Sequence, residues 1–443
     1  MTIDEIRRQM GEAGLDTVRL QFTDILGMVK SVSLPLSQLP RAVADGTWFD
    51  GSAIEGFARV SESDMVLRPD LDTFAIVPRS GNGHLARLFC SVANPDRSVS
   101  ETDPRQRLTR ILEAAASSGF RYVVAPEIEF FFLTGPDPSQ GAPRGADRAS
   151  YFDQADGPTD GLREEAVRRC AQAGIPVATS HHEVAAGQHE IDLAPLDALA
   201  AADAVITVRS IVRDAASDAG LMATFLPKPF TNESGSGMHA HQSLVDLKGK
   251  EVFFDAGDAY GLSAVAHGFL AGQLEHASGM CALVAPLVNS YKRLGAGFEA
   301  PALVSWARIN RSAMIRVPAA WQANDLPTRI ELRLPDPSAN PYLAFGAMLA
   351  AGMDGVDRKL LPPEPVEELP SLDFEPGRMT RHRLLKVPAS LGAALDALRD
   401  DDVMCQALGE PILHHFLNAK EIEYEEYRRQ VTPWELARYL PLY

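Results

Sequence analysis

Four short segments of the sequence carry ionisable or polar side chains at every second position, and this pattern most constrains the fold. The clearest is segment 121–133, where Glu127 and Glu129 flank Ile128 and three phenylalanines follow directly. Alternate side chains of a β-strand point to one face of the sheet, so both carboxylates share a face. A solvated face would explain them, but the apolar neighbours indicate burial, and buried carboxylates are tolerated mainly beside a cation. We therefore predict metal ligation here.

The other three segments repeat this arrangement. Their polar members are Glu183 and Glu190 in HHEVAAGQHEID, His239, His241 and Ser243 in GMHAHQS, and Arg329, Glu331 and Arg333 in RIELR. Strands that each present polar groups at a spacing of two can line a barrel or a curved sheet, with helices on the opposite face. The sequence therefore predicts a polar ligand cavity on one face of such a sheet.

The inventory of this face favours hard divalent cations. Its acidic and imidazole members are Glu127, Glu129, Glu183, Glu190, His239 and Glu331. An oxygen-rich set of this kind suits Mg²⁺ or Mn²⁺ and fits zinc or copper poorly. The HExxH spacing of a helical zinc site is absent. This number of carboxylates favours a site for two cations over a site for one.

Several arginines accompany the carboxylates in the sequence. They are Arg293, Arg311, Arg316, Arg329 and Arg333. A guanidinium group matches phosphate or carboxylate through two parallel hydrogen bonds. No GxxxxGK[ST] loop and no GxGxxG motif after a strand occurs. The residues alone thus indicate either a metal-dependent phosphoryl-transfer enzyme, which would bind its nucleotide in this cavity, or a metal-dependent hydrolase.

Length and charge narrow the class of protein further. The chain has 443 residues and a net charge of −17, so it can bury a large core and is a poor partner for nucleic acid. No apolar stretch is long enough to span a membrane and no secretory leader is recognisable, which predicts a cytoplasmic protein without a membrane partner. The four cysteines form no CxxC pair and are expected to be free thiols, mostly in the core.

Hydrophobic periodicity divides the chain into two parts and predicts an α+β fold. Strands are expected at 17–22, 31–34, 73–77 and 86–92, and helices at 105–118, 160–173, 198–219 and 264–275. We place the domain boundary between residues 103 and 104, giving domains 1–103 and 104–443. Two segments, 135–148 and 361–370, are rich in turn-forming or acidic residues and are predicted to be exposed loops.

With these residues identified, the sequence closely resembles the type I glutamine synthetases nearly end to end. The resemblance rests on the ordered motifs WFDGSAIEGFARVSESDM, APEIEFFF, SHHEVAAGQHEID, GSGMHAHQSL, NSYKRL, FEAP, NRSAMIRVP and RIELRLPDPSANPYLAF. It implies an N-terminal β-grasp domain and a catalytic domain with a curved antiparallel sheet flanked by helices. It also implies a dodecamer of two stacked hexameric rings with active sites between subunits.

The resemblance further implies a reaction and a role for each site residue. ATP would phosphorylate the γ-carboxylate of L-glutamate, and ammonia would attack the acyl phosphate. The metal ligands would be Glu129, Glu183 and Glu190 for one ion and Glu127, His239 and Glu331 for the other. The catalytic group would be Asp50, Glu299 and Arg311; the substrate group Tyr151, Ser234, Gly235, Arg293 and Arg333; and the ATP group His241, Ser243, Arg316 and Arg329.

Departures from the family pattern leave the identity of the amine substrate undecided. Ala53 stands where the family usually has a serine near the amine pocket, Ser234 replaces an asparagine, and Ala178 replaces a glutamate near the nucleotide. Loss of a hydroxyl group at Ala53 is compatible with relatives that join glutamate to a polyamine, a monoamine or ethanolamine. A γ-glutamylamine ligase is therefore the alternative to glutamine synthesis, and a catalytically inactive oligomer is a third reading that the retained metal ligands disfavour.

Overall fold

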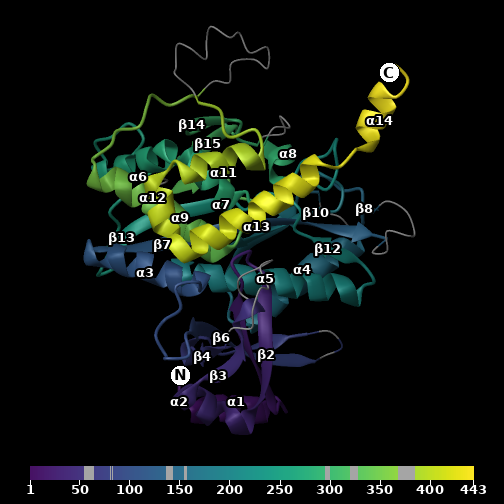
Figure 1. The fold of residues 1–443 in the computed structure, drawn as a ribbon, viewed down its shortest axis with the longest axis vertical. Helices are drawn as coiled ribbons and strands as arrows, with labels where there is room; N and C mark the ends of the chain where they lie inside the picture. Colours follow the sequence, from purple (N-terminus) through teal and green to yellow (C-terminus); the bar gives the residue numbers. More distant parts are fainter. Residues whose placement is uncertain are drawn as a thin grey trace.

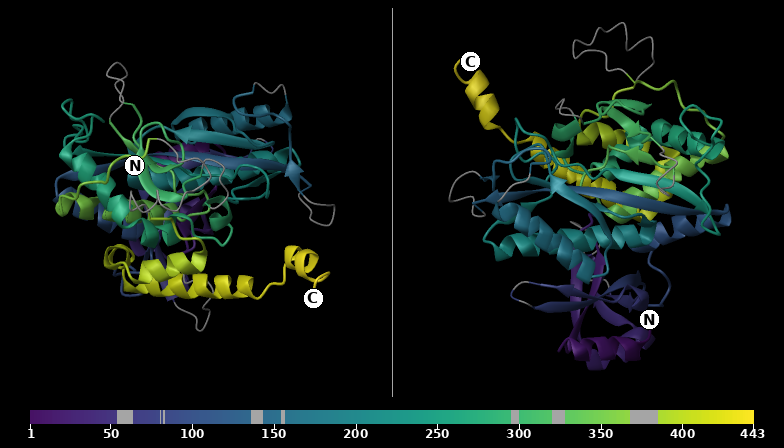
Figure 2. Two further views of the ribbon diagram at one scale, coloured as in Figure 1. Left: turned by 90° about the horizontal axis from the view of Figure 1, so that it is seen from above. Right: turned by 180° about the vertical axis from the view of Figure 1, so that it is seen from behind.

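The computed structural model describes residues 1–53, 64–79, 81, 83–135, 143–153, 157–294, 300–319, 328–367 and 385–443. Figure 1 shows a small N-terminal part below a larger body of sheet and helices, joined by the segment that leads into α3. The views in Figure 2 show the same two parts, with the C-terminal helix projecting away from both. The α+β class predicted from the sequence is confirmed.

The N-terminal part is a mixed sheet backed by helices. Its elements are α1 (Ile3–Glu12), β1 (Thr17–Thr23), β2 (Val29–Pro35), α2 (Leu39–Asp45), β3 (Thr47–Asp50), β4 (Asp64–Pro69), β5 (Ala75–Pro78) and β6 (His84–Ala93). The strand order is β2-β1-β6-β4-β3, with β5 also paired to β6 and with β1 parallel to β6. Helix α1 begins with a capping box between Thr2 and Glu5 and buries Ile6 and Met10, one turn apart, in the core of this sheet.

The larger sheet is organised around one long strand, β7 (Phe120–Thr134). The other strands are β8 (Arg144–Gly145), β9 (Val177–His182), β10 (Gln188–Leu193), β11 (Leu196–Asp197), β12 (Met222–Thr224), β13 (Ala240–Asp246), β14 (Leu303–Ala307), β15 (Ala313–Arg316) and β16 (Ile330–Leu332). Strand β7 pairs with β13 over 120–126 and with β10 over 127–131, both antiparallel. It therefore joins the two halves of the sheet at the position of its two glutamates.

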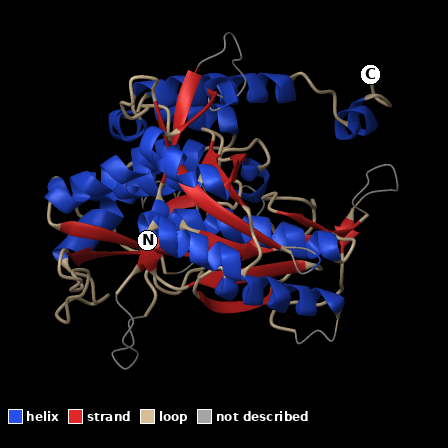
Figure 3. Cartoon of the chain, turned by 90° about the horizontal axis from the view of Figure 1, so that it is seen from below, coloured by secondary structure: helices blue, strands red, loops and turns tan. Residues whose placement is uncertain are grey.

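Helices cover the larger sheet, as the blue and red elements of Figure 3 show from below. The helices after the N-terminal part are α3 (Pro104–Ser117), α4 (Pro158–Gln172), α5 (Ala198–Asp218), α6 (Ala264–Glu275), α7 (Ala277–Val284), α8 (Ser290–Leu294), α9 (Pro341–Asp357), α11 (Leu391–Arg399), α12 (Asp402–Leu408), α13 (Glu410–Arg428) and α14 (Pro433–Tyr439), of which α14 projects from the body. Helices α6 and α9 cross so closely that a Cβ atom on Gly272 would lie 2.1 Å from the Ala351 carbonyl oxygen. Glycine at this crossing lets two almost wholly buried helices form the centre of the core.

Most predicted elements lie where the periodicity placed them. The four predicted helices correspond to α3, α4, α5 and α6, and the four predicted strands overlap β1, β2, β5 and β6. Three cysteines are buried and all four are free. Among the described helices, none has the length and apolar character needed to cross a membrane.

The two predicted exposed loops are only partly as expected. Residues 136–142 and 368–370 lie outside the described residues. Of the first loop, Arg144 and Arg148 are exposed as predicted, but Arg144–Gly145 pairs with β7, and the half-buried Asp147 accepts a hydrogen bond of 2.7 Å from Gly187 N, so the prediction was wrong at these points. The second loop has no helix or strand over 361–367, but Trp306 Nε1 binds the Pro363 carbonyl oxygen at 2.6 Å and so docks it onto β14.

A buried ionic network joins the two parts of the chain. Arg105 on α3 donates two hydrogen bonds to Asp203 on α5, at 3.1 and 3.0 Å, and one of 3.0 Å to Asp70 in the N-terminal part. Tyr342 on α9 donates a further hydrogen bond of 2.6 Å to Asp203. Breaking a buried ion pair is costly because the remaining charge stays uncompensated in a medium of low dielectric constant.

We expect Arg105→Leu to destabilise the protein by about 3 to 5 kcal/mol and Tyr342→Phe by about 1 kcal/mol. Arg110, on the same helix, provides the control: it pairs with Glu101, and the two side chains are 36% and 53% exposed, so Arg110→Leu should cost less than about 1 kcal/mol. Chemical denaturation of the three variants measures the loss in free energy of unfolding that each substitution causes. Equal losses for Arg105→Leu and Arg110→Leu would contradict the role assigned to this network.

Candidate active site

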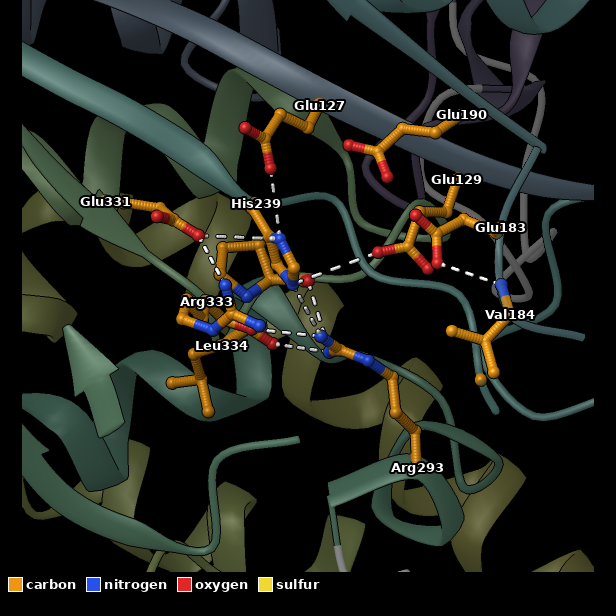
Figure 4. Close-up of polar contacts among 12 residues, drawn as sticks. Glu127, Glu129, Glu183, Val184, Glu190, His239, Arg293, Glu331, Arg333 and Leu334 are labelled. Atoms are coloured by element: carbon orange, nitrogen blue, oxygen red, sulfur yellow. Dashed lines mark hydrogen bonds and ion pairs between the residues drawn. The ribbon is translucent and has the colours of Figure 1, made fainter. Parts of the chain in front are cut away.

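A polar cavity of about 240 Å³ lies where β7, β10, β13 and β16 meet. Its lining includes most of the residues predicted from the sequence: Glu127, Glu129, Tyr151, Glu183, Glu190, Ser234, Gly235, His239, Arg293, Arg311, Arg316, Glu331 and Arg333. Figure 4 shows the carboxylates converging with His239 and Arg293 from separate strands and loops. Residues far apart in the sequence are thus brought to one cavity.

Strand register aligns the polar residues across the sheet. Glu190 on β10 pairs with Glu129 on β7, and His241 on β13 pairs with Glu331 on β16. Because directly paired residues of adjacent strands project to the same face, spacing within each strand and register between strands together build one polar face. The period-two pattern therefore predicted the correct face.

The glycine-rich turn before β13 lets the chain pass close to this face. A Cβ atom on Gly237 would lie 2.7 Å from Arg293 Nη2 and 2.8 Å from His239 Nε2. The Gly237 carbonyl oxygen accepts a hydrogen bond of 3.1 Å from Glu129 N. Any side chain at this position would displace groups that line the cavity.

The hydrogen bonds of His241 fix its tautomer and its orientation. Arg329 Nε donates to His241 Nδ1 at 3.2 Å, so Nδ1 accepts and Nε2 carries the proton of the neutral ring. His241 Nε2 then donates to Glu127 Oε1 at 2.6 Å. In this arrangement His241 orients the carboxylate of Glu127.

Arginines neutralise the carboxylate charge on one side of the cavity. Arg333 Nη1 donates to Glu331 at 2.6 Å, and Arg316 forms a second ion pair with this wholly buried carboxylate. Arg293 differs, because its Nη1 and Nη2 donate to the carbonyl oxygens of Leu334, Pro335 and Arg333. The geometry of Arg293 therefore indicates an anchor for the chain after β16, while its predicted contact with substrate carboxylate stays a prediction.

Two carboxylates on the opposite side of the cavity have raised pKa values. Burial, followed by the charge of Glu183, raises the pKa of Glu129 to about 8. Burial and the charges of Glu129 and Glu127 raise the pKa of Glu190 well above its usual range. For Glu127, burial acts in the same direction, but hydrogen bonds from two histidines outweigh it and hold its pKa well below the usual range. A divalent cation beside Glu129 and Glu190 would supply the missing charge.

Three clusters around the cavity have ligand atoms within 4.8 Å of one another, close enough to hold a cation. They are Glu127, His241 and Glu331; His181, Glu183 and Glu190; and Glu127, Glu190 and Asp192. The sets implied by the family resemblance have His239 and Glu129 where these have His241 and His181. Burial and the charge of Arg333 lower the pKa of His239 to about 4, so this imidazole is neutral, as a ligand must be. The oxygen-rich donors fit Mg²⁺ or Mn²⁺.

A second cavity of about 300 Å³ adjoins the first, since Glu127 and Asp192 line both. It contains the remaining predicted ATP-binding residues, His241, Ser243 and Arg329. Apolar side chains, including Val123 and Leu193, form much of its wall, and Ala178 also lies there. An apolar slot beside a charged cavity suits a nucleotide whose base enters the slot and whose phosphates enter the charged cavity.

Two predicted catalytic residues are not in this arrangement. Asp50 is exposed at the end of β3 in the N-terminal part, where it accepts a hydrogen bond of 3.0 Å from Ser52 N, and it does not line the described cavity. Glu299 lies outside the described residues, as does the side chain of Ala53.

The sequence analysis missed residues that orient the carboxylates. Gln188 Nε2 donates to Glu129 Oε2 at 2.9 Å and to the Gly235 carbonyl oxygen at 3.1 Å. Asp192 continues the alternation of Glu190 on β10 and lies opposite Glu127, so the same spacing rule could have found it. Behind the strands, Asp147 binds His182 Nε2 at 3.0 Å and Gly187 N, although its own segment resembled a loop.

Comparison with known proteins identifies the family. Residues 14–95 match the model described as "Glutamine synthetase, beta-Grasp domain", and residues 101–439 match "Glutamine synthetase, catalytic domain". The chain is 47% identical to a glutamine synthetase of Thermus thermophilus over 99% of each chain, and 44% identical to one of Halobacterium salinarum over 99% of this chain and 95% of the relative.

Solved structures agree with these sequence matches. A GmaS/ADP complex superposes with a TM-score of 0.84 at 29% identity, covering 98% of this chain and 99% of the other. A structure described as a novel glutamine synthase homolog superposes with a TM-score of 0.81 at 27% identity, covering 96% and 98%. With both domains matched in order and relatives aligned end to end, the chain belongs to the glutamine synthetase family.

Proposed function

We propose that this protein is a glutamine synthetase, which joins ammonia to the γ-carboxylate of L-glutamate at the expense of ATP. The observation that carries this proposal is the junction of the two cavities at Glu127, one lined by carboxylates and arginines and the other largely apolar. A nucleotide held across this junction would present its terminal phosphate to the charged cavity. Relatives named glutamine synthetase, at 44 to 47% identity over the full chain, support the same activity.

The proposed reaction has two steps that balance. A γ-carboxylate oxygen of glutamate attacks the terminal phosphorus of ATP, ADP leaves, and γ-glutamyl phosphate forms. Ammonia nitrogen then attacks the acyl carbon, phosphate leaves with the C–O bond electrons, and the nitrogen loses a proton. Arg311 and Arg316 line the cavity and would stabilise the transferring phosphoryl charge. Bound Mg²⁺ or Mn²⁺ would contribute Lewis-acid neutralisation of the phosphate charge.

We also propose an oligomer in which neighbouring chains share each site, as in the dodecamer implied by the family resemblance. The family resemblance gives Asp50 the role of the acid that a neighbouring subunit contributes to hold and deprotonate ammonium. Asp50 is exposed and does not line the cavity of its own chain, so in this role it would have to serve a neighbour. Helix α14 projects from the body with Trp434, Leu436 and Leu440 at least 49% exposed. Apolar side chains on a projecting helix favour a contact with another subunit.

Glu129→Gln and Glu331→Gln should each reduce turnover at least about 100-fold, because each removes a negative charge that holds the divalent cations needed at the phosphate. Glu113→Gln, on the exposed face of α3, is the matched control and should retain full activity. Phosphate release with glutamate, ATP and ammonia measures turnover, and titration with Mn²⁺ measures cation affinity directly. Full activity with unchanged Mn²⁺ binding in either site variant would contradict the metal assignment.

Subunit exchange between Asp50→Ala and Glu331→Gln proteins should restore about a quarter of wild-type activity at equal mixing, since random assortment gives some sites both intact residues. The double variant, which carries Asp50→Ala and Glu331→Gln in the same chain, should stay inactive when it is assayed alone. If exchange is demonstrated by labelled subunits and no activity returns, the sites are not shared between chains.

A γ-glutamylamine ligase is the second candidate, favoured by Ala53 next to the segment that carries Asp50. If ammonia is the substrate, Ala53→Ser should lower its apparent KM a few-fold, because one hydrogen bond to a charged group contributes about 1.5 to 3 kcal/mol before competition from water. The control is Ala114→Ser at an exposed position of α3, which should leave the apparent KM unchanged. A wild-type kcat/KM at least tenfold higher for a polyamine, monoamine or ethanolamine than for ammonia would reverse the assignment.

A further inference from the structure

The largest of the described cavities lies between the two parts of the chain, away from the active site. Its volume is about 600 Å³, within the range of small-molecule sites. The turn between β1 and β2 and the strands β5 and β6 form one wall, and helix α5 forms another. No residue of this wall belongs to the two cavities described above.

Two buried arginines line this cavity, and neither forms an ion pair with a carboxylate among the described residues. Arg87 on β6 is 6% exposed and donates only to neutral oxygens, the Thr73 carbonyl at 3.1 Å and Thr207 Oγ1 at 3.0 Å. Arg209 on α5 is 7% exposed and donates to the Ala339 carbonyl oxygen at 2.9 Å. The Nε atom of each is buried without a hydrogen-bond partner. Unpaired buried cations are costly, and an anion would offset that cost.

The protein's own acids do not neutralise this cavity. Five basic and two acidic side chains line it, although the whole chain is strongly acidic. Asp214 pairs with Arg79 at 2.9 Å, and Glu423 pairs with Lys420 at 2.8 Å, which leaves three guanidinium groups in excess. Asp203, the carboxylate that acts electrostatically on Arg87, is already bound by two nitrogens of Arg105.

Burial lowers the pKa values of these two arginines. Burial lowers the pKa of Arg87 to about 10, and burial together with the charge of Arg213 lowers that of Arg209 to about 9. Arg213 itself is exposed at the cavity and lies 5.1 Å from the centre of the Phe225 ring. Met28, Val29 and Leu226 add exposed apolar surface. The lining thus combines cationic groups with apolar side chains.

We propose that this interdomain cavity is a second ligand site, which binds a small molecule carrying a carboxylate or phosphate group on an apolar body. Arg87, Arg209 and Arg213 bind the oxyanion, and the apolar side chains contact the body. Because the lining comes from both parts of the chain, a bound anion stabilises their docking.

Binding is measured on the full-length protein without metal or ATP, by calorimetry and by the change in melting temperature. The probes are inorganic phosphate, AMP and glutarate, which separate phosphate recognition from carboxylate recognition. At least one probe should bind and raise the melting temperature. Arg213→Gln should weaken that binding about tenfold or more, since a charge-assisted contact is lost, and its exposed position makes folding insensitive to the change.

Two controls separate this site from other anion sites. Arg41→Gln removes an exposed arginine of the N-terminal part that does not line the cavity, and Arg316→Gln removes one from the catalytic cavity. Both should retain the affinity of the wild-type protein for the probe, while Arg209→Gln should lose it as Arg213→Gln does. Absence of binding for all three probes at 10 mM, about the weakest useful affinity, would overturn the proposal. So would a loss of affinity in Arg316→Gln with none in Arg213→Gln.

Discussion

Repulsion between buried carboxylates is the constraint on which this site depends. Glu129, Glu183 and Glu190 line one cavity, and burial followed by the charge of Glu183 raises the pKa of Glu129 to about 8. Such a cluster would separate unless the backbone held it. The backbone does so here, because β7 and β10 fix Glu129 opposite Glu190 by ladder hydrogen bonds, and Gln188 binds the Glu129 carboxylate. Sheet register thus holds together negative charge that bound cations would offset.

The sequence predicted the polar face because period-two spacing is a local property of a strand. Glu127 with Glu129, and His239 with His241, share a face whatever the rest of the chain does. Gln188 and Asp147 were missed because their importance arises only from pairing: one reaches Glu129 across the sheet, and the other binds His182 from a segment that resembled an exposed loop. Spacing predicts which side chains align, while register decides which ones touch.

The helices were predictable for a similar reason, but the ionic network between the two parts of the chain was not. Helices α3 to α6 follow from hydrophobic periodicity, which each segment carries by itself. Arg105, by contrast, reads as an ordinary charge in the first turn of a helix, yet it is 6% exposed and joins Asp203 to Asp70. Only tertiary packing distinguishes this arginine from the solvent-facing Arg110 five residues later. Burial of charge is a property of the assembled fold.

Helix α5 contacts the ionic network, the interdomain cavity and the strand of the active site. Asp203 takes two hydrogen bonds from Arg105 and one from Tyr342, which begins the helix following the arginine-rich β16 segment. Thr207, one turn further along α5, binds Arg87 of the cavity. Helix α5 packs directly on β7, the strand that carries Glu127 and Glu129. An anion held by Arg87 and Arg209 would therefore lie against the helix that packs on the strand carrying Glu127 and Glu129.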